Sequence, residues 1–151
     1  MGGNKNEKMI PPMSWNTLLD KPFGYNPTIK NFKKNIIPPY KLSIYSMKNI
    51  HKSTQIDTIY RFYHKKSELF VYKIQTGGEL FFAGNIYDNK IRLLNGVEVG
   101  MNRGAFFNSF TDLKYSPNDT VKLASKTAPY TYKFVFKKDI LSGIKIETYI
   151  D

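Results

Sequence analysis

The side chains best suited to chemistry in this chain are its two histidines, His51 and His64. His51 lies in the basic segment KNIHKST, and His64 directly precedes Lys65 and Lys66. Neighbouring cations disfavour a protonated imidazole, and neither histidine has a nearby carboxylate in the sequence to orient its ring. Folding could bring Asp57 close to either one. From the sequence alone, neither histidine is predicted to be catalytic.

The acidic residues form no recognisable catalytic or metal-binding pattern. The twelve acids are scattered, without an i, i+3 or i+4 pair in an expected helix, and Asp88, Asp119 and Asp139 fall in expected turns. A carboxylate pair formed across strands stays open, but nothing in the sequence selects one. Cysteine is absent, and the segments DNK and SPNDTVK lack the oxygen-ligand spacing of a calcium loop. We therefore predict no catalytic residue, no cofactor and no metal site.

Two glycine-containing segments, TGGE at 76–79 and NGVEVGMNRG at 95–104, are candidates for phosphate-binding loops. Both have too few glycines, and both lack the lysine that such loops require. The sequence therefore favours turns with positive φ at these positions.

Positive charge is concentrated in the first half of the chain. The formal net charge is +11, and residues 1–66 hold 12 basic against three acidic residues, whereas residues 67–151 hold 11 against nine. Such a distribution suits phospholipid headgroups, nucleic acid or an acidic protein. Only three of the 23 basic residues are arginine, which favours nonspecific attraction over base reading. A lysine-rich solvated surface is the alternative explanation.

Residues 1–8, MGGNKNEK, are predicted to form a flexible tether. The segment resembles the start of a mature bacterial lipoprotein, with Met1 in the place of the lipidated cysteine. One acyl chain anchors weakly, so a polybasic surface would add to the attachment. The resemblance implies a periplasmic or outer-membrane-associated protein whose signal peptide has been removed. A cytoplasmic protein with a native start is the alternative.

Residues 9–40 read as a proline-rich arm packed on the domain. Six of the eight prolines lie there, and proline removes the amide donor that ladders and helix interiors need. One short helix is expected in SWNTLLD, with Ser14 as its N-cap. Trp15, the sole tryptophan, is expected to pin the arm to the domain.

Residues 41–151 are predicted to form a single α+β domain with a mostly antiparallel, twisted sheet. A helix near 102–113, capped by Asn102 and carrying Phe106 and Phe110 on its apolar face, should pack on the sheet. The hairpin turn expected at Asp88-Asn89 joins the last two strands of a five-stranded meander. The expected strands are KLSIYS, QIDTIYRFYHK, ELFVYKIQ, ELFFAGNIY and KIRLLNG before the helix, and TVKLAS, YTYKFVFK and GIKIETYI after it.

The segment from about 93 to 149 resembles the β-lactamase-inhibitor-protein-like family and the small lipoproteins of outer-membrane assembly. The resemblance rests on Val99-Gly100-Met101-Asn102 at the helix start and on the closing pair YTYKFVF and GIKIETY. Arg103-Gly104 departs from the acidic residues usual after that start. The resemblance implies a binding or scaffolding module without enzymatic activity.

Alternation in IYRFYHKKSELFVYK turns charged and aromatic side chains outward together. The candidate partner-binding residues are Arg61, Tyr63, Lys65, Lys66, Tyr72 and Lys73. We predict a non-enzymatic, exported, lipoprotein-type module that binds an unknown protein or envelope component, with an anionic membrane surface as a further partner. An inhibitor or immunity protein for an acidic enzyme is the alternative. Single-stranded nucleic acid is disfavoured, because the same alternation is typical of any strand with one wet face.

Overall fold

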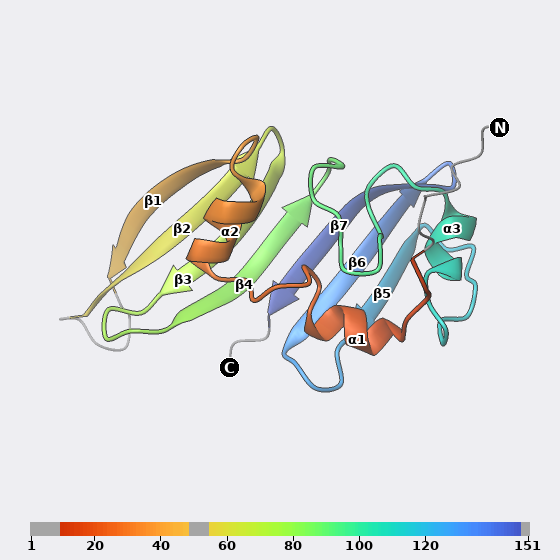
Figure 1. Cartoon of the computed structure of the whole chain (residues 1–151), viewed down its shortest axis with the longest axis horizontal. Helices are drawn as coiled ribbons and strands as arrows, with labels where there is room; N and C mark the ends of the chain where they lie inside the picture. Colours follow the sequence, from red (N-terminus) through yellow and green to blue (C-terminus); the bar gives the residue numbers. More distant parts are fainter. Residues whose placement is uncertain (1–9, 49–54, 149–151) are drawn as a thin grey trace.

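The structure is a computed structural model that describes residues 10–48 and 55–148. It shows an α+β fold in which one open antiparallel sheet is packed by short helices (Figure 1), which confirms the predicted fold class. The predicted tether and His51 lie outside the described residues. In chain order the elements are α1 (Trp15–Asp20), α2 (Ile29–Ile36), β1 (Lys41–Lys48), β2 (Ile56–His64), β3 (Ser67–Lys73), β4 (Glu79–Ile86), α3 (Arg103–Asn108), β5 (Thr120–Ala124), β6 (Tyr130–Lys137) and β7 (Ile140–Thr148).

The seven-stranded sheet consists of two meanders joined side by side. Its strand order is β1-β2-β3-β4-β7-β6-β5, and every neighbouring pair is antiparallel. The meanders meet where β4 pairs with β7, from Ala83 opposite Glu147 to Ile86 opposite Ile144. The strand order is therefore symmetric about this pair, apart from the additional edge strand β1.

All three described helices pack on one face of the sheet, in front of it in Figure 1. Phe32 of α2 contacts Phe62 of β2 at 5.4 Å between ring centroids. Phe106 of α3 lies 4.9 Å from Phe134 of β6. From α1, the Leu19 carbonyl accepts a hydrogen bond from the buried Tyr132 hydroxyl. These contacts belong to one continuous apolar core, whereas the opposite face, called the open face below, carries none of the three helices.

The arm contains one helix more than the sequence indicated. The helix expected in SWNTLLD is present as α1, but α2 was missed because prolines flank it on both sides. Its N-terminus is capped twice, since Thr28 accepts from the Asn31 amide at 3.2 Å and Glu79 accepts from the Ile29 amide at 2.7 Å. Burial of its apolar stripe then holds it on the sheet.

One expected strand before α3 is a loop. KIRLLNG forms no ladder, so the hairpin expected at Asp88-Asn89 is wrong, as is a fifth strand in the first meander. Ile91, Leu93 and Val97 are nevertheless buried in the core. The apolar residues alternate in this segment because the loop directs them into the core. Within the loop, the Leu93 amide donates to the Val97 carbonyl at 2.9 Å.

The stretch 95–104 works as a corner that leads into α3. Gly96 and Gly100 have φ of 82° and 103°, as expected for turns. Asn102 caps the helix, with its side chain accepting from the Ala105 amide at 2.7 Å. The helix ends at Asn108, earlier than predicted, because the next residues pair with the arm: Met13 bridges Phe110, and its amide donates to the Ser109 carbonyl at 3.1 Å.

Asp112 ties the start of α1 to the domain. Its carboxylate accepts from the Trp15 amide at 2.9 Å and from the Ser14 hydroxyl at 2.7 Å. The Trp15 amide, and then Ser14, lower the pKa of Asp112 below its ordinary 3.8. A carboxylate whose folded pKa is depressed stabilises the fold above its unfolded pKa, and this contribution is lost as the pH falls through the folded pKa.

We therefore expect wild type to be more stable than Asp112→Asn at pH 7, and the difference to shrink below about pH 4. Asparagine keeps an acceptor oxygen for the Trp15 amide, presents its NH2 group to the Ser14 hydroxyl, which can accept as well as donate, and carries no charge. Urea unfolding followed by Trp15 fluorescence across pH measures the difference. A difference that stays constant from pH 7 to pH 3 contradicts this assignment.

Candidate binding surface

Aromatic side chains cluster on the β2–β4 part of the open face. Phe70 of β3 and Phe82 of β4 are 5.8 Å apart between ring centroids, and Tyr72 lies 6.3 Å from Phe82. The β3–β4 register shifts between Phe70 and Val71, which leaves Phe82 without a paired residue. Such a bulge turns an additional side chain onto one face of the sheet. Together with exposed Leu80, these rings form the aromatic patch: Phe70, Tyr72, Leu80 and Phe82.

Arg61 and Tyr63, both predicted to contact a partner, lie beside the aromatic patch. The Arg61 guanidinium stacks over the Tyr63 ring at 4.3 Å from its centroid. It also forms an ion pair with Glu68, at 2.6 Å between Nη2 and Oε1. Arg61 is thus held in place and its charge is partly offset, so its planar surface is presented to solvent in a fixed orientation.

Tyr72 is fixed by a buried carboxylate. Asp57 is fully buried, and it accepts hydrogen bonds from the Tyr72 hydroxyl and from the Gln75 amide. The hydrogen bond to Asp57 is the main cause that raises the pKa of Tyr72. Gln55 donates to the same carboxylate at 3.0 Å. No local sequence pattern indicates this network, in which Asp57 orients a surface ring.

The six predicted residues do not form one cluster. Lys65 and Lys66 lie in the β2–β3 turn, where Lys65 has φ of 53°. Lys73 pairs with Thr58, so it projects from the helix-covered side of the sheet. Tyr63 and Lys65 do line a shallow hollow together with Pro39, Lys41 and His64. His64 packs against the Tyr40 ring at 5.6 Å.

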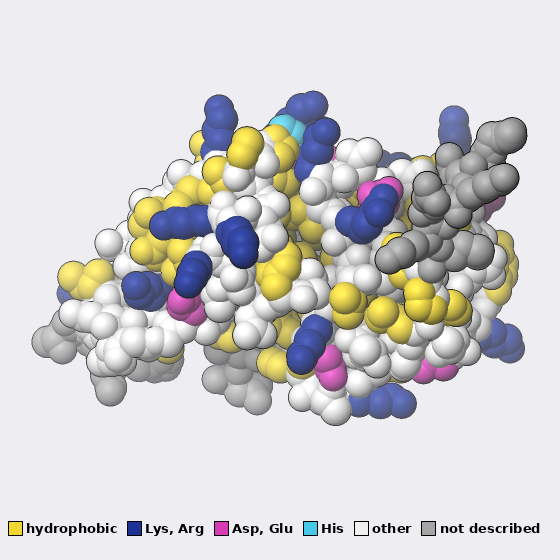
Figure 2. Space-filling model, in the orientation of Figure 1, with side chains coloured by type: hydrophobic (Ala, Val, Ile, Leu, Met, Phe, Trp, Pro, Cys, Tyr) yellow, Lys and Arg dark blue, Asp and Glu magenta, His cyan; other side chains and the backbone are white. Residues whose placement is uncertain are grey.

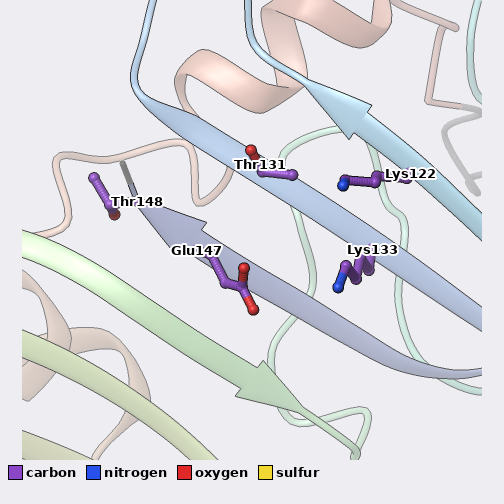
Figure 3. A pocket seen from close by; sticks show the side chains of 5 residues that line it. All are labelled: Lys122, Thr131, Lys133, Glu147 and Thr148. Carbon is purple, nitrogen blue, oxygen red and sulfur yellow. The ribbon is translucent and has the colours of Figure 1, made fainter. Parts of the chain in front are cut away.

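A row of lysines crosses the β5–β7 part of the open face. Lys122 of β5 pairs with Lys133 of β6, which pairs with Lys145 of β7. We call these three residues the lysine row. Glu147 offsets it in part, through an ion pair with Lys145 at 3.3 Å. Figure 3 shows Lys122 and Lys133 beside Thr131 and Glu147, which line a hollow at the edge of the row. Sequence reasoning missed the row, because only the strand register places these lysines side by side.

The helix-covered face carries a second cluster of basic side chains. Lys30, Lys33 and Lys34 are exposed on α2, and Figure 2 shows Lys and Arg side chains over that helix. Their i, i+3 and i+4 spacing places them on one side of the helix.

Most described carboxylates have structural roles. Glu79 caps α2, Asp112 ties the arm, and Asp20 accepts from Ser125 and Thr127. Asp88 accepts from the Tyr40 hydroxyl at 3.2 Å. Within residues 10–48 and 55–148, no group of three potential metal ligands comes together.

Comparison of the chain with known protein families, curated proteins and solved structures found no match. Across the part of the chain that the structure describes, no helix is long and apolar enough to cross a membrane.

Proposed function

We propose that this protein is a non-enzymatic binding module whose open face docks an acidic protein of the bacterial cell envelope. The observation that carries the proposal is the composition of that face. An aromatic patch adjoins a row of lysines on a continuous sheet surface, and none of the three described helices covers it.

The two parts of the open face suit different steps of binding. Half-buried aromatic rings already fixed by neighbours lose little conformational freedom on binding, which suits them as anchors. The lysine row and the surrounding positive field would draw an acidic partner toward the face. An acidic enzyme inhibited by the module is one partner of this kind.

The use of the carboxylates supports a non-enzymatic role. Catalytic acids and bases need a reactive group directed at a substrate. Here the most deeply buried acid, Asp57, is engaged by Tyr72, Gln55 and Gln75. Glu79 caps α2, and Asp20 and Asp112 hold the N-terminal arm to the rest of the domain through hydrogen bonds.

A photo-crosslinking amino acid placed at Leu80, on the open face, tests the docking surface. In cells of the native host, we expect it to capture one acidic protein, and capture should weaken when Lys122 and Lys133 are replaced by alanine. The matched control places the same amino acid at Asn35, which is exposed on α2. Equal capture from both positions, or capture that is indifferent to the lysines, contradicts the proposal.

We also propose that the protein is exported and lipid-anchored, as residues 1–8 suggest. Metabolic labelling with an alkyne-bearing fatty acid in the native host should then label the protein. The natural reading frame should encode a signal peptide followed by a cysteine immediately before Gly2. A frame that encodes no such signal rejects the anchor and leaves the docking surface untouched.

A further inference from the structure

The lysine row places like charges at directly paired positions of neighbouring strands. Residues that pair directly in an antiparallel sheet have Cβ atoms about 5 Å apart, and like charges at such positions are destabilising. Among the described residues, Lys145 forms an ion pair with Glu147, but Lys122 and Lys133 form none. Three cations and one anion leave two positive charges on this small area.

Thr131 adds a hydroxyl group without a partner to the same place. The residue is 6% exposed, and its Oγ1 forms no hydrogen bond. Buried hydroxyl groups are rarely left in this state, because losing water without a replacement partner is costly. Thr131 of β6 pairs with Glu147 of β7, and it lines the hollow together with Lys122 and Lys133.

Figure 3 shows how these groups lie. Thr131 turns its methyl group toward Lys122 and its hydroxyl to the other side. Rotation about χ1 to another staggered position brings the hydroxyl to the lysine side. The hollow then offers one neutral donor and two ammonium groups on two neighbouring strands, beside the Glu147 carboxylate, whose charge Lys145 offsets.

We propose that this hollow binds a phosphate monoester group. Such a group carries a charge of about −1.5 to −2 at pH 7 and three acceptor oxygens, which match the excess of two positive charges and the donors available. Lysine binds phosphate as a point charge and needs no planar geometry. The phosphate belongs either to a soluble ester or to a lipid headgroup. The site does not depend on the protein partner proposed above.

Titration of the ¹⁵N-labelled protein with inorganic phosphate, at an ionic strength held constant with sodium chloride, tests the site. We expect saturable amide shifts centred on residues 122, 131 and 133. Lys122→Ala with Lys133→Ala should weaken binding at least about tenfold, since two charged contacts are lost. Thr131→Val should weaken it by about fivefold while keeping or raising the melting temperature, because valine replaces the hydroxyl group with a methyl group of similar size.

The matched control is Lys33→Ala with Lys34→Ala, which removes the same charge from α2 and should leave phosphate affinity unchanged. Sedimentation with vesicles separates the two sources. Preference for phosphatidic acid, a monoester, over phosphatidylglycerol, a diester, indicates a lipid headgroup; binding of phosphate without that preference indicates a soluble ester. Three results would each overturn the proposal: no saturable shifts, equal loss of affinity in the α2 control, or unchanged affinity in Thr131→Val.

Discussion

Replacing Arg103 with alanine is expected to lower the free energy of unfolding by about 3 kcal/mol. Arg103 is 4% exposed, and its Nη1 donates to the carbonyls of Ser116 and Asn118 at 3.0 and 2.7 Å. Its guanidinium also stacks over Phe136 and pairs with Asp139 at 2.7 Å. One side chain thus joins α3, the loop before β5 and the β6–β7 turn. Chemical denaturation at pH 7 measures the change.

Asp139→Asn is the control for this prediction. The Asp139 side chain is 76% exposed, so the ion pair itself is well screened. Asparagine tolerates the φ of 61° found there and keeps an acceptor. We expect a cost of about 1 kcal/mol or less. If Asp139→Asn destabilises as much as Arg103→Ala, the charge pair dominates and the carbonyl contacts contribute little.

Replacing Phe106 with alanine is expected to cost about 3–5 kcal/mol. The Phe106 ring is fully buried, and it contacts four other rings at centroid distances of 4.9–5.2 Å. Deleting the ring leaves a cavity between α3 and the sheet, and β6 cannot move to fill it without breaking its ladders. Thermal and urea unfolding measure the effect.

Tyr115→Ala provides the comparison, because Tyr115 contacts only the edge of this aromatic cluster through Phe107 and is 60% exposed. We expect it to cost about 1 kcal/mol or less. Similar losses in the two variants would mean that α3 is loosely packed and that the cluster does not hold the helix in place.

The strands could be predicted because one face of the sheet is buried. In β6, the alternation of Tyr132, Phe134 and Phe136 reports the face under the helices directly. The same logic failed for Ile91 and Leu93, since a loop folded over a core also alternates. Burial is readable from such a pattern, but pairing is not, because the ladder partner lies elsewhere in the chain.

The candidate surface was predicted only in part for the same reason. Arg61 and Tyr63 share a face by local alternation, and the structure places them together. The lysine row depends on the β5–β6 and β6–β7 registers, which turn lengths and bulges set and which no local pattern reveals. Asp57 was considered as a partner for either histidine; its carboxylate accepts from the Tyr72 hydroxyl, and His51 lies outside the described residues.

The near-symmetric strand order has a consequence for recognition. Since the two meanders meet through the antiparallel pair β4 and β7, three strands of each are related in order by a rotation about this pair, and the first meander has β1 in addition. An elongated partner would therefore fit by shape in either of two directions. Aromatic rings at one end of the face and ammonium groups at the other remove that ambiguity, because a ligand with one apolar and one anionic end matches the face in one orientation alone. On the proposed function, the sheet would thus set the direction in which a bound partner lies across it.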